Sequence, residues 1–165
     1  MKKLVTSILC TVMCVGIFAM STNAESKKTV SLYPENEILI SRNTQEMDDG
    51  TYIEITISKA LELSRASNSV SGTKTFSCRN KDGAILWQFF VHGTFSINNG
   101  TAACTSASHS YKIVDSDWNY VSGTSSKSGN KATGHGKFNR KMLFITVETK
   151  ECDVILSCDG NGKLS

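Results

Sequence analysis

Three histidines, His92, His109 and His135, are the residues of this 165-residue chain best suited to acid–base chemistry near neutral pH. A nucleophilic hydrolase would hold one of them between a serine or cysteine and a carboxylate. Serine is so frequent here that such a triad can be drawn by chance, and the sequence contains no Gly-x-Ser-x-Gly segment. We therefore expect no catalytic residues and no enzymatic activity. His92 should lie on the polar face of a strand, and His109 should be partly buried and hydrogen-bonded.

Metal binding is suggested only by residues 115–119, which read Asp-Ser-Asp-Trp-Asn like the opening of a calcium loop. Tyr120 stands where that loop needs glycine, and Ser126 stands where it needs an acid. The histidines show no metal-ligand spacing. We expect an ordinary turn around Asp115, with a loosely calcium-stabilised turn as the alternative, and we expect no metal site and no cofactor.

Binding chemistry is concentrated in residues 118–141. Residues 127–141 contain no acidic side chain and include five cations that could contact an anionic polymer of the cell envelope. These cations are Lys127, Lys131, Lys137, Arg140 and Lys141. The alternative is an edge strand whose lysines prevent pairing with another chain. Trp118 and Tyr120 could form an aromatic platform for a sugar, although packing of Trp118 in the core is the favoured alternative.

Export is predicted by residues 1–24. Two lysines precede an uncharged, largely apolar stretch, and Thr22 and Ala24 are the small residues expected before a cleavage site. An uncleaved anchor is the alternative, but the stretch is marginal for a span of roughly 20 residues. We expect a secreted protein that starts at Glu25, has no membrane span after cleavage, and is at most loosely associated with the cell wall.

The charge of the predicted mature chain is nearly balanced. Of the 18 lysines and arginines, two belong to the signal peptide, and 15 acidic side chains oppose the rest. This balance argues against nucleic acid as a partner. The expected partner is an anionic envelope polymer, a glycan or another protein.

Four cysteines follow the signal peptide: Cys78, Cys104, Cys152 and Cys158. An even number in an exported chain predicts two disulfides, for which three pairings are possible. No Cys-x-x-Cys is present, which argues against a zinc site. Cys152 and Cys158 share one face of the last predicted strand, while Cys78 precedes the longest strand and Cys104 follows it. We therefore predict Cys104–Cys158 and Cys78–Cys152 bridges.

The longest predicted strand, residues 85–97, is the one around which the others are arranged. Its odd-numbered residues are apolar apart from Gly93, and most of those between them are polar. Alternation of this kind is typical of a strand with one buried face. Gly93 predicts a bend or bulge at which the strand passes from one sheet to the other.

Shorter alternating segments, separated by turn residues, recur at intervals of about eight to twelve residues. Residues 58–66 could continue a strand or form a helix. Residues 130–138 carry glycines and are predicted to be an edge strand, followed by a strand whose Leu143, Ile145 and Val147 face the core. The pattern predicts an all-β fold, an antiparallel β-sandwich or flattened barrel of about seven to nine strands with at most one short helix.

A series of motifs in residues 73–165 resembles a family of small secreted proteins from Gram-positive, clostridial bacteria of the gut. The series consists of Trp87, Gly93-Thr94-Phe95, Gly100-Thr101, Cys104, Ser110-Tyr111, Trp118, residues 127–132, residues 156–158 and residues 162–165. The order of the motifs is more specific than any one of them. The resemblance implies export and a bacterial source, and it assigns no activity. It also implies that Cys104 and Cys158 are shared, whereas Cys78 and Cys152 are an additional pair.

These observations divide the chain into a signal peptide (1–24), an N-terminal leader with a possible edge strand (25–50) and a disulfide-stapled β-sandwich domain (51–165). The expected function is that of a non-catalytic binding or interaction module at the cell envelope or in the extracellular space. The alternative is a secreted, bacteriocin-like antagonistic protein, because small β-sandwich bacteriocins also carry export signals and cationic, glycine-rich strands.

Overall fold

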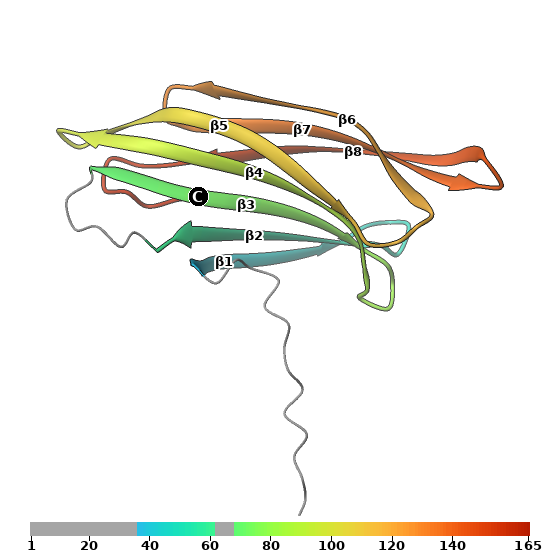
Figure 1. Cartoon of the computed structure of the whole chain (residues 1–165). Coiled ribbons are helices and arrows are strands. Elements are labelled where there is room, and N and C mark those ends of the chain that lie inside the picture. The colour runs from blue at the N-terminus through green and yellow to red at the C-terminus, as the bar shows by residue number, and fades with distance from the viewer. Residues whose placement is uncertain (1–35, 62–67) are drawn as a thin grey trace, which may run out of the picture. The chain divides into compact units, whose positions relative to one another are not determined.

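The computed structural model describes residues 36–61 and 68–165, which form eight antiparallel strands in two packed sheets (Figure 1). The strands are β1 (Glu37–Glu46), β2 (Tyr52–Ala60), β3 (Ser69–Arg79), β4 (Ile85–Asn98), β5 (Thr101–Ile113), β6 (Trp118–Ser128), β7 (Lys131–Met142) and β8 (Ile145–Ser157). One sheet has the order β1-β2-β3-β4-β5 and the other β6-β7-β8. The predicted antiparallel β-sandwich is confirmed.

Several predictions concern residues outside this part of the chain. The signal peptide, its cleavage before Glu25, residues 25–35 of the leader and residues 62–67 are not described. The remainder of the leader forms β1 at the edge of the larger sheet, and β2 continues to Ala60. The described residues form no helix, and so none that is long and apolar enough to cross a membrane.

The core is built on β4, as its alternating sequence predicts. Trp87, Phe89, Val91 and Phe95 face the smaller sheet and are almost completely buried. The ring of Trp87 stacks on that of Phe138 in β7, with centroids 3.9 Å apart. Burying each of these large side chains contributes roughly 1.5–3 kcal/mol, so this face holds the two sheets together.

β4 stays in one sheet along its whole length, so the predicted crossing at Gly93 is wrong. The strand pairs with β3 and β5 through this residue, and the β4–β5 register shifts only between Thr94 and Phe95. A Cβ at position 93 would lie 2.8 Å from the Phe95 ring and 3.1 Å from the Ala132 Cβ. The glycine therefore makes room for the core, and the irregularity in the β4–β5 register begins at the next residue, Thr94.

β7 is the central strand of the smaller sheet, so the predicted edge position of residues 130–138 is also wrong. The glycines that weaken its strand pattern have a packing role. A Cβ at Gly136 would lie 2.8 Å from the Phe89 ring, and one at Gly134 would collide with Val91. Small residues in β7 let the two sheets approach each other. The lysines of β7 accordingly do not protect a free edge.

The β7–β8 hairpin reaches beyond the other turns at the same end of the domain (Figure 1). Leu143 and Phe144 form its two-residue turn, with φ values of +47° and +70°, between the paired Met142 and Ile145. The exposed fractions of residues 142 to 145 are 53%, 90%, 100% and 68%. We call residues 142–145 the apolar tip. The prediction that Leu143, Ile145 and Val147 face the core is wrong, because the hairpin extends past the core at this point.

The four cysteines are free thiols in this structure, so the predicted bridges are not formed in it. Burial raises the pKa of the Cys78 thiol to about 11 and that of Cys152 to about 12, which keeps both protonated at neutral pH. These two lie on β3 and β8, which pack across the core. The backbone N–H groups of Cys104 and Cys158 donate to the carbonyls of two neighbouring residues, 129 and 130. The members of each predicted pair thus lie in the same region.

Candidate functional site

A charged cleft of about 270 Å³ lies at the end of the domain from which the apolar tip extends. The β1–β2, β3–β4 and β5–β6 turns meet there because strands paired in sequence order return to the same end. Its charged lining residues are Asp49, Lys81, Asp115, Arg140 and Glu148. Buried Trp118 forms part of the floor. The cleft thus carries both signs of charge above a buried aromatic side chain.

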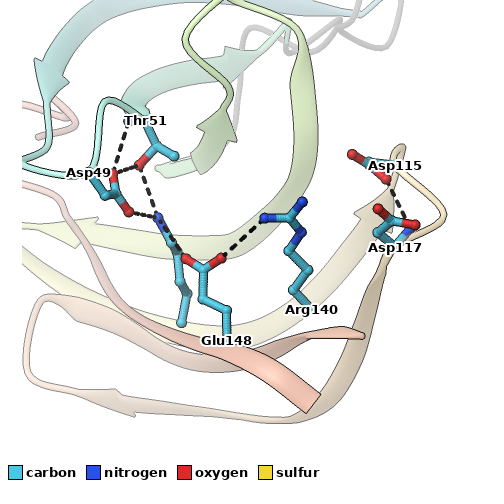
Figure 2. Close-up of polar contacts among 7 residues, drawn as sticks. Asp49, Thr51, Asp115, Asp117, Arg140 and Glu148 are labelled. Atoms are coloured by element: carbon cyan, nitrogen blue, oxygen red, sulfur yellow. Dashed lines mark hydrogen bonds and ion pairs between the residues drawn. The ribbon is translucent and has the colours of Figure 1, made fainter. Parts of the chain in front are cut away.

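A network of ion pairs crosses this end of the domain (Figure 2). Lys150 Nζ donates to Asp49 Oδ2 at 2.7 Å and to Thr51 Oγ1 at 2.9 Å, and it lies 3.4 Å from Glu148 Oε1. The other oxygen of Glu148 lies 3.9 Å from Arg140 Nη1. Hydrogen bonds from Lys150 and Thr51 hold the pKa of Asp49 well below its usual value. The network ties the β1–β2 turn to β8, and each of its acids is already paired.

Asp115 makes the turn that its sequence predicts. Its Oδ1 accepts a hydrogen bond from the backbone N–H of Asp117 at 2.9 Å, and the Asp117 carbonyl accepts one from the N–H of Lys141 (Figure 2 shows the two aspartates). Across residues 36–61 and 68–165, no three His, Cys, Asp or Glu side chains are grouped so that they could hold a metal ion. An Asx-turn at Asp115 joins β5 to β6, and the backbone carbonyl of Asp117 joins this turn to β7.

Trp118 is buried against Trp87, with ring centroids 6.0 Å apart, and so it does not form a surface platform with Tyr120. The favoured alternative, packing in the core, is confirmed. Tyr120 instead stacks on the exposed Tyr111 of β5, with centroids 3.7 Å apart and rings within 9° of parallel. Its hydroxyl lies 3.3 Å from His109 Nε2, which gives that partly buried histidine the expected partner.

The five predicted cations follow β6 and β7 rather than forming one patch. Lys127 and Lys131 flank the β6–β7 turn, whereas Arg140 and Lys141 lie near the other end of β7. At about 3.3 Å per residue, the two groups are roughly 30 Å apart. Three of the five contact other residues: Lys127 donates to the Thr105 carbonyl (2.5 Å), Lys137 pairs with Glu151 (2.8 Å) and Arg140 contacts Glu148 (3.9 Å). Contact with an anionic polymer stays a prediction.

A chain of hydrogen bonds on the outer face of the five-stranded sheet was not foreseen from the sequence. Thr73 Oγ1 donates to Glu37 Oε1 at 3.0 Å and lies 3.0 Å from His92 Nδ1. His92 Nε2 lies 2.9 Å from Ser110 Oγ. Since the hydroxyl proton of Thr73 goes to Glu37, His92 must donate from Nδ1, which leaves Nε2 to accept from Ser110. We call these four residues the outer relay.

The outer relay has the nucleophile–base–orienter order of a hydrolase triad, with Thr73 inserted before the acid. Burial lowers the pKa of His92, only partly opposed by the Glu37 carboxylate, so the imidazole is neutral at pH 7. Beside it is a shallow cleft of about 160 Å³. Ser58 also donates to Glu37, so this carboxylate of β1 accepts hydrogen bonds from both β2 and β3. Every polar group of the relay is therefore bound within the sheet.

A second cleft at the charged end, of about 310 Å³, has Trp87 and Phe76 in its apolar wall and Lys150 at its rim. The indole N–H of Trp87 is buried and has no hydrogen-bond partner in the part of the chain that the structure describes. An unpaired buried donor costs roughly 1–3 kcal/mol.

No protein family, curated protein or solved structure matched this chain in the three comparisons that were made. The resemblance to small secreted clostridial proteins stays a prediction.

Proposed function

We propose that the protein is an exported, non-catalytic binding module that acts at the cell envelope or in the extracellular space, and that it contacts its target through the apolar tip. The observation that carries this proposal is the exposure of four consecutive apolar side chains at the end of a projecting hairpin. Covering a Leu or Phe side chain contributes roughly 1.5–3 kcal/mol. Exposed apolar clusters of this kind mark interaction surfaces.

The backbone of the turn supports the same function. Both Leu143 and Phe144 have positive φ values, a conformation that costs an ordinary L-residue roughly 1–2 kcal/mol. Two-residue turns with this geometry favour Asn-Gly. The chain instead carries two bulky apolar residues that make no contact with the core. Contact with a target would offset this cost.

Cell binding tests the proposal. Leu143→Asn combined with Phe144→Gly removes the apolar surface while giving the turn the residues that its backbone prefers. We expect labelled variant protein to bind whole bacterial cells at least tenfold more weakly than the wild type. The matched control, Val121→Thr with Ile155→Thr, removes two other exposed apolar side chains and should bind normally. Equal binding by the tip variant and the wild type would contradict the proposal.

An antagonistic, bacteriocin-like protein is the second candidate, because an exposed apolar hairpin could also disturb the envelope of a competing cell. Purified protein would then inhibit the growth of related strains, and the tip variant would not. Binding to those cells without growth inhibition would favour the binding module.

We also propose that the exported protein carries Cys104–Cys158 and Cys78–Cys152 disulfides. The fold supports this pairing by bringing the members of each pair to the same region. Peptide mapping without reduction tests it, and a Cys78–Cys104 or Cys152–Cys158 peptide would show it to be wrong. Mass spectrometry of the same sample should find a chain that starts at Glu25.

A further inference from the structure

We propose that the partner of the apolar tip is a lipid bilayer containing anionic phospholipids, into whose surface the tip inserts. The inference rests on the proposed binding function and adds the chemistry of the target. It depends on three properties of the tip: the directions in which its apolar side chains point, the length of the apolar part of the hairpin, and the charged residues that precede this part on β7.

Apolar surface is present at the end of the hairpin as well as on its side. Met142 and Ile145 are a cross-strand pair, so their side chains share one face. Leu143 and Phe144 occupy the turn itself and are almost fully exposed. A groove on a partner protein would cover one face of such a hairpin. Apolar side chains at both the end and the side of the hairpin are better covered by an apolar medium that surrounds the tip, such as the acyl chains of a bilayer.

The apolar part is short. The pair behind Met142 and Ile145 is Lys141 with Thr146, and both of these residues are polar. At about 3.3 Å per residue, plus the length of a side chain, the tip could enter a bilayer by roughly 5–10 Å. This is the depth of the boundary between headgroups and acyl chains, where water can still satisfy the peptide groups of the turn. The geometry suits shallow insertion and not a membrane span.

Charges behind the tip favour anionic headgroups. Lys141 is exposed, and neither a hydrogen bond nor an ion pair of its side chain occurs among the described residues. Arg140, next to it, has among the described residues only a long 3.9 Å ion pair, with Glu148, and that carboxylate is shared with Lys150. Two cations therefore stand where lipid phosphates would lie if the tip were inserted.

Vesicle binding tests the inference with the secreted chain. Wild-type protein should sediment with vesicles of phosphatidylglycerol and phosphatidylcholine, and more weakly with phosphatidylcholine alone. The Leu143→Asn, Phe144→Gly variant should lose at least tenfold in affinity, while Val121→Thr with Ile155→Thr should not. Lys141→Glu should weaken binding to the anionic vesicles severalfold. Thermal unfolding of each variant verifies that its fold is intact.

A tryptophan at the tip reports insertion directly. The chain has two tryptophans, Trp87 and Trp118, and both are buried, so their emission should not change with lipid. Phe144→Trp should shift its emission to shorter wavelength on addition of anionic vesicles, and lipids brominated on their acyl chains should quench it. An unshifted, unquenched emission would overturn insertion.

Failure of this inference can be distinguished from failure of the proposed function. If the wild type does not sediment with any vesicle but the tip variant still loses cell binding, the lipid partner is wrong and the binding function stands. A tip-dependent dimer in solution, without vesicle binding, would likewise overturn the lipid partner in favour of a second copy of the chain. If the tip variant and the wild type bind vesicles equally, the tip is not the contact.

Discussion

The outer relay and the apolar tip differ in whether their side chains have partners within the protein. In the outer relay, Glu37, Thr73, His92 and Ser110 look chemically reactive, yet each makes its hydrogen bonds to another member of the sheet. In the apolar tip, chemically inert side chains lie in solvent without contact to the core. Residue types that suggest catalysis thus lie in a network whose polar groups are bound within the sheet, whereas the proposed contact surface consists of apolar side chains exposed to solvent.

The largest expected effect is on binding through the tip. Phe144→Ala should weaken cell and vesicle binding by about ten- to a hundredfold, the equivalent of the roughly 1.5–3 kcal/mol gained by burying Phe. Met142→Ala should have a smaller effect because Met142 is already about half buried. Equilibrium binding of the single variants measures the series. An effect of Met142→Ala larger than that of Phe144→Ala would contradict insertion from the end of the hairpin.

The second prediction concerns the stability of the outer relay. Thr73→Val keeps the shape of the side chain but leaves Glu37 and His92 without their shared partner. Since an unmade bond to a buried polar group costs roughly 1–3 kcal/mol, the melting temperature should fall by about 4–8 °C. Cell binding should not change.

The control for this change is Thr149→Val, which removes one exposed hydroxyl that bonds Asn139. It should alter stability by less than about 0.5 kcal/mol. Equal melting temperatures for Thr73→Val and Thr149→Val would mean that the relay does not stabilise the fold. Loss of cell binding in Thr73→Val alone would make the relay a functional site.

The third prediction uses the pH dependence of the relay. The pKa of His92 is lowered in the folded protein, mainly by burial, with Glu37 opposing and His109 adding to the shift. The unfolded chain therefore binds the proton more readily, and stability should decrease as the pH falls through about 6.5, the pKa of an unperturbed histidine. His92→Gln should reduce this dependence, as followed by melting temperature between pH 7.5 and 5.5. A stability that increases on acidification in this range would contradict the assignment.

The smallest effect is expected at the ion-pair network near the base of the tip. The pKa of Asp49 is lowered, so its contribution to stability is present above an unfolded pKa of about 3.9 and disappears as the pH falls below that value. Its side chain is half exposed, and pairs of this kind contribute about 0–1 kcal/mol. Asp49→Asn should therefore change the melting temperature only slightly at pH 7. A decrease as large as that of Thr73→Val would show that the network matters as much as the relay.

Alternation in the sequence was enough to predict two antiparallel sheets and the buried face of β4. In a strand with a clear period of two, the apolar residues all lie on one face, and that face is the one that is buried. It failed where packing between the sheets decides the outcome. The glycines of β7 look like an edge strand in sequence, but they make room for Phe89. Gly93 was likewise assigned a backbone role from the sequence, but it makes room for the ring of Phe95.

The candidate sites were harder to predict than the fold. The outer relay depends on register, which brings Glu37 and Ser110 to the two sides of His92 from distant parts of the chain. The apolar tip did leave a signal, since residues 142–145 are four consecutive apolar residues where a strand with one buried face would alternate. This break in the period marks the point where the hairpin leaves the core, so that Leu143 and Ile145 are exposed.

The strand order has a consequence for how the protein matures. In both sheets every hydrogen-bonded neighbour is the preceding or following strand, without a crossover. If the proposed export proceeds from the N-terminus to the C-terminus, each strand can pair with its predecessor as soon as it emerges. Such neighbouring pairings require only short loop closures, which lowers their entropic cost. During such export the larger sheet could assemble hairpin by hairpin, and the projecting β7–β8 hairpin would be among the last parts to emerge.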